Sequence, residues 1–241
     1  MNTPNLKNAL KTIRLFGTSW IAEKTLDHLE AIRRYELDVA LQLLPLKGRL
    51  LEIGAGTGWQ ALELEKRGYD VSAIDLPSSK YRENRIRTIT DYDGKEIPFE
   101  DNVFDIVFSS NVFEHVPHIV EFQKEIHRVL KPDGYALIVL PSSSWRLWTN
   151  ITHLLKYWTI PPTHGEHAGN PLMEIYYFSG RWWSRLFHET GWIVVTQDSN
   201  RLFYTGPSIA DSRLHMSTRR KLSRVLGSSC HIFVLRRGNH A

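Results

Sequence analysis

Residues 50–58 have the sequence Leu-Leu-Glu-Ile-Gly-Ala-Gly-Thr-Gly, in which three alternating glycines follow a short apolar run. The apolar run predicts a buried strand, and the residues after it predict a helix, so the glycines fall in the turn between the two. Glycine lacks a Cβ atom, which lets the backbone pass close beneath a ligand. The stretch therefore predicts a nucleotide-binding turn at the end of a strand.

The dinucleotide fingerprint G-x-G-x-x-G is not completed here, because position 59 is Trp59 and the third glycine stands at position 58. Asp75 ends a second predicted strand, about 20 residues further on, where a carboxylate accepts hydrogen bonds from both hydroxyls of an adenosine ribose. NAD and S-adenosylmethionine both carry that ribose diol, so Asp75 alone does not separate them. The displaced glycine disfavours NAD.

Strands and helices alternate outward from this turn. Strands are predicted over residues 49–53, 70–74, 104–109, 135–140, 192–197 and 231–236, and helices over 59–67, 119–130 and 180–190. Strands rich in Val, Ile and Leu between helices indicate an α/β fold with a doubly wound, mostly parallel sheet. Helical spacing over 5–44 predicts an N-terminal helical extension, residues 1–46, ahead of a domain at 47–241.

Five motifs occur in order along the chain. They are Glu52–Gly58, Asp75, residues 93–99 (Asp-Gly-Lys-Glu-Ile-Pro-Phe) leading to Phe104-Asp105, residues 111–115 (Asn-Val-Phe-Glu-His) and residues 130–134 (Leu-Lys-Pro-Asp-Gly). Together they resemble the class I S-adenosylmethionine-dependent methyltransferases, in the ubiquinone/menaquinone-type small-molecule branch. The resemblance extends from about Leu50 to Leu140 and implies a Rossmann-like methyltransferase fold with S-adenosylmethionine as cofactor.

The resemblance also implies which residues hold the methionine end of the donor. Gly54, Gly56 and Gly58 would line it, and Glu52 would lie beneath them. Asn111, at the end of the fourth strand, would lie beside the methionine part.

A second group of residues would hold the nucleoside. Asp75 would bind the ribose and Leu76 would pack on the adenine. Asp93 would accept from the adenine amino group while the amide of Gly94 faces the ring. Asp91 is an alternative to Asp93, but the spacing to the following Pro-Phe pair favours Asp93.

The acceptor side is predicted from three histidines. A hydroxyl is a poor nucleophile that gains from a base with a pKa near neutrality, which makes histidine the first candidate. His115 follows Asn111 at the carboxyl end of the fourth strand, and His164 and His167 lie in an aromatic and histidine-rich insertion, residues 142–178, that shows no regular period. A metal cluster at His164, Glu166 and His167 is an alternative, but a third or fourth ligand is missing nearby, so no metal is expected.

Composition limits the class of protein. The 241 residues carry a net charge of +4 and one cysteine, Cys230, which we expect to be buried and structural. The sequence shows neither a membrane span nor a secretory signal, so a cytoplasmic protein is expected. The cations gathered near the C-terminus indicate a solvated face, or attraction to an anionic acceptor or peripheral contact with a membrane. No nucleic-acid reader motif accompanies them, so nucleic acid is not expected as a partner.

Three functional hypotheses follow. The first is methyl transfer to a small-molecule or glycan-linked acceptor at a hydroxyl oxygen, for which the aromatic insertion would supply a stacking wall. The second is C-methylation of a quinone-like or lipid acceptor, as the quinone-type resemblance suggests. The third is a non-catalytic scaffold protein that binds the donor without turnover.

Overall fold

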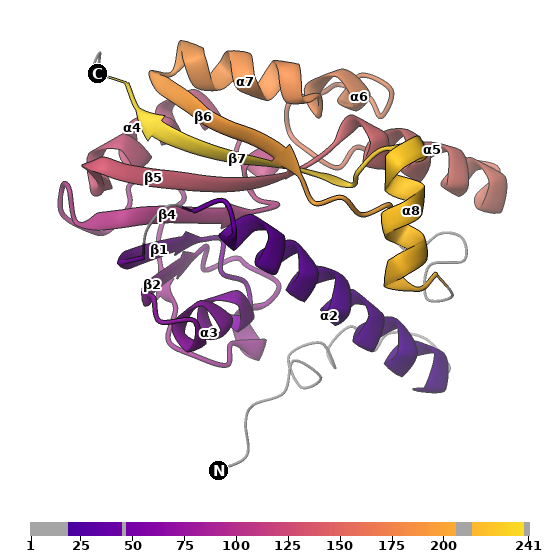
Figure 1. Ribbon diagram of the computed structural model, residues 1–241, viewed down its shortest axis with the longest axis horizontal. Helices are drawn as coiled ribbons and strands as arrows, with labels where there is room; N and C mark the ends of the chain where they lie inside the picture. The colour runs from indigo at the N-terminus through magenta and orange to yellow at the C-terminus, as the bar shows by residue number, and fades with distance from the viewer. Residues whose placement is uncertain (1–18, 45–46, 206–213, 239–241) are drawn as a thin grey trace.

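A computed structural model describes residues 19–44, 47–205 and 214–238, and seven strands within these ranges form one sheet (Figure 1). The strand order is β3-β2-β1-β4-β5-β7-β6. Strand β7 alone runs in the opposite direction to the other six, so its pairs with β5 and β6 are antiparallel. The strands are β1 (Arg49–Ile53), β2 (Asp70–Asp75), β3 (Thr90–Asp91), β4 (Phe104–Ser110), β5 (Leu130–Pro141), β6 (Trp192–Ser199) and β7 (Cys230–Arg237). The predicted fold class is thereby confirmed.

Helices cover both faces of the sheet. Successive side chains of a strand point to opposite faces, so each strand contributes to two separate hydrophobic cores. Leu51 packs in the core that contains Ile126 of α4 and Phe187 of α7, whereas its neighbour Leu50 packs with Leu37 of α2 and with α3. The helices are α2 (Ser19–Leu41), α3 (Trp59–Lys66), α4 (Ile119–Val129), α5 (Ser143–Tyr157), α6 (Glu174–Tyr177), α7 (Gly180–Glu189) and α8 (Met216–Leu226), with 3₁₀ turns η2 (Arg82–Asn84) and η3 (Phe113–His115).

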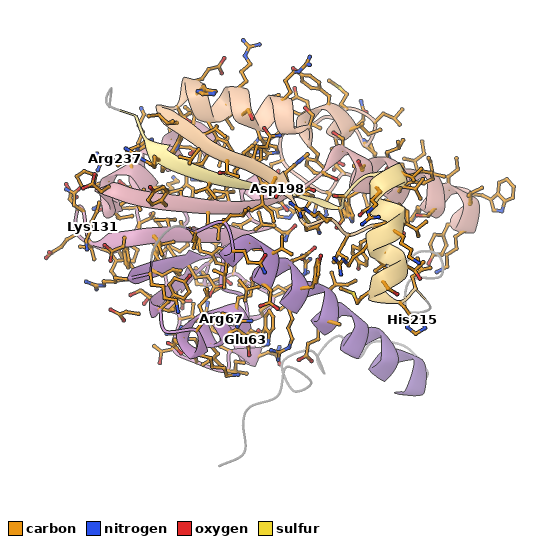
Figure 2. The ribbon with its side chains drawn as sticks, viewed as in Figure 1. Glu63, Arg67, Lys131, Asp198, His215 and Arg237 are labelled. Atoms are coloured by element: carbon orange, nitrogen blue, oxygen red, sulfur yellow. The ribbon has the colours of Figure 1, made fainter. Side chains whose placement is uncertain are left out.

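The direction of the parallel strands decides where a ligand can bind. Figure 2 shows Lys131, near the start of β5, and Arg237, at the end of the reversed strand β7, at one end of the sheet. His215, just before α8, lies toward the other end. Open α/β sheets bind ligands outside the carboxyl ends of their strands, so the site is expected at the end near α5 and α8.

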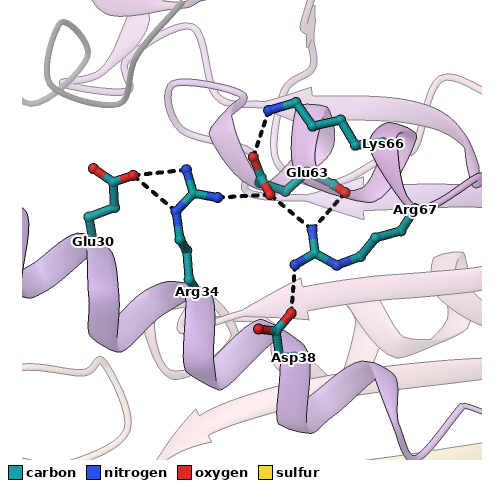
Figure 3. A network of polar contacts seen from close by, with 6 residues as sticks. All are labelled: Glu30, Arg34, Asp38, Glu63, Lys66 and Arg67. Carbon is teal, nitrogen blue, oxygen red and sulfur yellow. Dashed lines mark hydrogen bonds and ion pairs between the residues drawn. The ribbon is translucent and has the colours of Figure 1, made fainter. Parts of the chain in front are cut away.

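Ion pairs fix α2 against α3 (Figure 3). Arg34 and Arg67 both contact the carboxylate of Glu63, at 2.9 Å each, and Arg67 also reaches Asp38 on α2. Burial opposes ionisation of Glu63, but hydrogen bonds from Lys66 and the two arginines outweigh it and lower its pKa to about 2. The network thereby fixes the middle of α2 beside α3.

The prediction of an irregular insertion over residues 142–178 was wrong, because α5 occupies most of the first half of this segment. Ser142 caps the helix by accepting a hydrogen bond from the amide of Trp145 at 3.1 Å. Leu147, Ile151, Leu154 and Leu155 of α5 follow a helical spacing, so this helix could have been predicted from the sequence. No element was predicted where α8 lies, and the first part of the predicted N-terminal helices, residues 5–18, lies outside the described residues.

Candidate active site

The glycine turn has the conformation that the sequence predicts. Gly54, Gly56 and Gly58 have φ values of +75°, +56° and +81°, a region that side-chain-bearing residues rarely adopt. The amide of Gly54 donates to the carbonyl of Ile74 at 2.9 Å, which ties the turn to β2. A Cβ atom on Gly58 would lie 2.5 Å from the side chain of Arg87. The turn therefore tolerates only glycine at this point.

The residues predicted to hold the nucleoside meet around Asp75. Its carboxylate accepts from the amides of Gly56 and Leu76, both at 2.8 Å. Two acceptor positions of the carboxylate remain for a diol, since an ionised carboxyl offers about four. A Cβ atom on Gly94 would lie 2.9 Å from the side chain of Leu76, so these two residues face each other. His118 holds the Gly94 carbonyl at 2.8 Å.

The two aspartates considered for the adenine contact differ in their partners. Arg82 and Arg85 contact both oxygens of Asp91, at 2.9 Å and 2.7 Å. Asp93 is exposed, and one of its oxygens accepts from the amides that follow it, beginning with Lys95 at 2.8 Å, which lowers its pKa. The second oxygen of Asp93 makes none of these hydrogen bonds. The contacts therefore favour Asp93, as the spacing did, although its role stays a prediction.

Glu52 is a buried carboxyl with a raised pKa at the predicted donor end of the site. Its side chain is buried, and its Oε2 atom has no hydrogen-bond partner. Burial raises the pKa of its carboxyl to about 8, against an opposing effect of Arg87. A buried carboxyl with one unpartnered oxygen, just before the glycine turn in sequence, fits a ligand that carries a positively charged group.

A cavity of about 580 Å³ lies beside this turn. Asn111, which is predicted to lie beside the methionine part of the donor, lines this cavity directly after β4 and adopts a positive φ of 55°. His115 and His164 line the same cavity, so the fold brings together two of the three predicted histidines. The other lining residues are Arg33, Glu36, Lys80, Tyr81, Pro141, Trp145, Tyr204, Ser229 and Cys230.

Glu114 joins the two histidines. Its side chain is fully buried, and neither carboxylate oxygen has a hydrogen-bond partner. One oxygen lies 3.7 Å from Nε2 of His115 and 3.8 Å from Nε2 of His164, and the two rings are 4.8 Å apart. Burial lowers the pKa of His115, with Glu114 acting against it. The ring of His115 is therefore neutral at pH 7 and can accept a proton.

A buried ion pair positions His164. Glu174 accepts from the amides of His164 and Gly165 at 2.6 Å and 2.7 Å, and its second oxygen lies 2.7 Å from Nε of Arg146 on α5. Arg146 and Glu174 are both almost fully buried. A Cβ atom on Gly165 would lie 2.7 Å from the carbonyl oxygen of Glu114. Glu174 thus fixes the backbone of the loop at His164 and Gly165, and the loop packs tightly against η3.

His167 lies apart from the other two histidines. Its Nε2 atom is 3.3 Å from the carbonyl oxygen of Phe113, and its ring packs 5.4 Å from Trp182 and 5.9 Å from Trp183. It does not line the cavity. Within the described part of the chain, the one group able to hold a metal ion is Glu114 with His115 and His164. His167 and Glu166 are not part of this group, so the alternative metal set of His164, Glu166 and His167 does not come together.

Several cavity residues were missed by reasoning from the sequence. Glu114 was quoted within a motif without a role, and the tryptophans of the insertion were not distinguished from one another. Arg33 and Glu36 reach the cavity from α2, which lies before the predicted domain. Tyr81 packs near Gly56 from the loop after β2. No local pattern marks these residues, because they are brought to the cavity from separate segments.

The sheet order, the glycine turn and the acidic residue at the end of β2 define a class I methyltransferase, the class that uses S-adenosylmethionine as donor. A family model described as "Methyltransferase domain" matches residues 28–197, and the chain belongs to that family.

Curated relatives and solved structures agree with this assignment. The biotin biosynthesis bifunctional protein BioHC of Cellvibrio japonicus is 28% identical over 152 residues, which cover 56% of this chain and 30% of BioHC. The malonyl-[acyl-carrier protein] O-methyltransferase of Geobacter sulfurreducens is 31% identical over 121 residues, which cover 45% of each chain. The matched segments thus span less than half of either relative.

The fold is shared with a Haloferax volcanii methyltransferase solved in complex with the Trm112 methyltransferase activator. The TM-score is 0.60 at 18% identity, and the alignment covers 92% of this chain and 96% of that one.

Proposed function

We propose that this chain transfers a methyl group from S-adenosylmethionine to a hydroxyl oxygen of a small-molecule or glycan-linked acceptor. The observation that carries the proposal is the pair His115 and His164, which line a cavity next to the donor turn and are backed by the buried carboxyl of Glu114. Methyl transfer to an alcohol oxygen needs a group that removes the hydroxyl proton, and a neutral histidine is suited to it.

The donor site has the features that S-adenosylmethionine requires. Asp75 has free acceptor positions for the ribose hydroxyls, and Leu76 packs against Gly94, so the two would form one wall beside an adenine ring. The unpartnered oxygen of Glu52 suits the positively charged methionine end. When bound, the donor supplies a methyl group on a cationic sulfur that leaves as a neutral thioether.

The residues of the cavity would align and deprotonate the acceptor. His115 would take the hydroxyl proton as the acceptor oxygen bonds to the methyl carbon and the carbon–sulfur bond breaks. One ring nitrogen of His115 faces Glu114, which leaves the other nitrogen for the acceptor. The carboxylate of Glu114 would stabilise the protonated ring, which afterwards loses its proton to solvent.

The walls of the cavity support a sugar or ring as acceptor. Trp145 packs 4.8 Å from His164, and Tyr81 forms part of the wall near the donor turn. Aromatic faces stack on sugars and flat rings while their edges exclude water. Lys80 adds positive charge, which suits an acceptor that carries a phosphate or carboxylate, whereas the charge of Arg33 is balanced by Glu36 at 2.6 Å.

C-methylation of a quinone-like acceptor is the rival hypothesis. The printed names of relatives include an O-methyltransferase, an N-methyltransferase and a sterol C-methyltransferase. The methylated atom therefore has to be argued from the site, and the histidine cluster favours oxygen. Mass spectrometry with NMR of the product separates the two, since only a hydroxyl acceptor gives an O-methyl ether.

The test begins with calorimetric titration of S-adenosylmethionine and S-adenosylhomocysteine. Both are expected to bind, and Asp75→Ala is expected to abolish binding. Transfer is then measured on sugar and quinone acceptors with His115→Gln, and with His188→Gln as control because His188 is exposed and lines a separate hollow. His115→Gln should keep donor binding and lose most of the rate.

Two outcomes would contradict the proposal. Full activity in His115→Gln would remove the histidine base. Donor binding without turnover on any acceptor would favour the scaffold hypothesis.

A further inference from the structure

Exposed apolar side chains gather on the insertion. Of the fourteen large apolar side chains exposed in the described residues, nine fall within 147–176. Five form the α5 tip, which consists of Leu154, Leu155, Tyr157, Trp158 and Ile160. Trp158 ends α5 in the left-handed conformation and is 86% exposed. Single exposed apolar residues are ordinary, but a concentration of this kind marks an interaction surface.

The apolar surface continues onto the segment that leads into α6. Leu172, Met173 and Tyr176 are all about half exposed or more. This segment lies beside α5, because Asn150 donates to the carbonyl of Pro171 at 3.1 Å and Ser143 donates to that of Ile175 at 2.6 Å. The α6 segment thus packs along α5 from Ser143 to Asn150, and the α5 tip follows at the C-terminal end of the same helix.

The charges of α5 and α8 have one sign. Neither α5 nor α8 contains an acidic residue. Lys156 lies within the tip, with its ammonium 4.8 Å from the ring of Tyr157. Helix α8 adjoins α5 through the indole of Trp148, which donates to the carbonyl of Leu226 at 2.9 Å. The exposed cations of α8 are Arg220, Lys221 and Arg224.

A groove connects the tip with the acceptor cavity. It has a volume of about 400 Å³ and shares Trp145 and His164 with that cavity. Thr149, His153 and Tyr157 continue it along α5, at the helical spacing of four residues. Tyr157 therefore belongs both to the groove and to the α5 tip.

We propose that the α5 tip docks into the surface of an anionic membrane. Tryptophan and tyrosine favour the boundary between lipid head groups and acyl chains, where the ring is partly dry and its polar edge stays wet. The cations of α5 and α8 complement anionic lipid head groups. Contact at the surface is the relevant mode, since no helix in the described ranges is long and apolar enough to span a bilayer.

Docking in this way specifies the acceptor class. If the proposed methyl transfer holds, the groove would lead the polar head of a membrane-borne acceptor, such as a lipid-linked sugar, from the α5 tip to His164. This second step rests on the proposed function, whereas docking itself does not.

Sedimentation of the full chain with lipid vesicles tests the docking. Binding is expected to phosphatidylcholine vesicles that contain phosphatidylglycerol, to weaken with added salt, and to be weaker without phosphatidylglycerol. The double variant Leu155→Glu/Trp158→Glu should lower the partition coefficient at least about tenfold, because two large apolar side chains no longer enter the interface. Both side chains are mostly exposed, so the fold is spared.

Val120→Glu is the matched control. Val120 is 44% exposed on α4 and lines a hollow together with Arg237, which Figure 2 shows at the far end of the sheet. This variant adds a negative charge yet should bind vesicles as the unmodified chain does. Equal binding by the α5 tip variant, or no vesicle binding by the folded chain, would overturn the proposal. So would a dimer in light scattering that the tip variant dissociates without any vesicle binding.

The two proposals fail in different ways. Vesicle binding without transfer to any acceptor would leave docking intact and remove the proposed function. Transfer to soluble acceptors without vesicle binding would leave the proposed function intact and remove docking. Loss of transfer to lipid-linked acceptors alone, in the α5 tip variant, is the result expected if both hold.

Discussion

Glu52→Gln is expected to stabilise the donor-free protein at neutral pH, although it should weaken donor binding. Burial raises the pKa of Glu52 from 4.5 to about 8. Between these two pH values the folded chain keeps a proton that the unfolded chain has released. Stability contributed by this group is therefore highest below pH 4.5 and falls as pH rises toward 8. The amide of the variant does not titrate, so the variant escapes this loss.

The size of the effect follows from the same shift. One pKa unit corresponds to about 1.4 kcal/mol, so the carboxyl costs on the order of 3 kcal/mol more at pH 8 than at pH 5, as an upper limit. Urea denaturation of both proteins at pH 5, 6, 7 and 8 measures it. The difference in unfolding free energy should grow with pH in favour of Glu52→Gln. A difference that is independent of pH would refute the reasoning.

Donor binding offers a second measurement of the same group. If a positively charged donor draws Glu52 into its ionised form, binding near pH 7 releases a proton. Calorimetry in buffers of different ionisation enthalpy should detect this release in the unmodified chain and a smaller one in Glu52→Gln.

Other predictions concern the acceptor side. Glu174→Gln leaves the buried guanidinium of Arg146 without its charged partner. The unfolding free energy measured in urea should fall by about 3 kcal/mol or more. A loss below about 1 kcal/mol would mean that water reaches the pair. Gly165→Ala places a Cβ atom 2.7 Å from the carbonyl oxygen of Glu114, so kcat should fall while calorimetry shows unchanged donor affinity; unchanged kcat would contradict a role for this loop. Burial lowers the pKa of His115 from 6.5, so kcat/KM should decrease on acidification only below pH 6.5. A decrease on acidification that begins above pH 6.5 would contradict His115 as the base. Zn²⁺ should inhibit transfer by occupying the histidine pair while EDTA has no effect, and loss of activity in EDTA, restored by a metal, would assign the cluster to a cation.

Local pattern was sufficient where neighbours in sequence are also neighbours in space. The run from Glu52 to Gly58 predicts a strand, a turn and a helix from backbone chemistry alone. Asp75 could be placed because strands of a parallel sheet end at a common edge. The structure places the turn and Asp75 as predicted, and their contacts to the donor stay predictions.

Local pattern failed for the insertion, where apolar side chains serve two purposes. Some residues of α5 line the groove or face α8, and others, such as Leu155 and Trp158, remain exposed. The helical spacing of Leu147, Ile151 and Leu154 was nevertheless present in the sequence and was overlooked. Capping by Ser142 was a second signal that could have located the helix.

The sequence by itself determined the class of protein, the donor and the edge of the sheet where ligands bind, because these follow from short motifs in a fixed order. Only the tertiary structure decided which histidines share a cavity. Glu114 and His164 are 50 positions apart in sequence, and they meet because the Arg146–Glu174 pair holds one loop against η3. His167, three positions further on, is turned toward Trp182 and Trp183 instead. Long-range packing sets such pairings, and no local spacing encodes them.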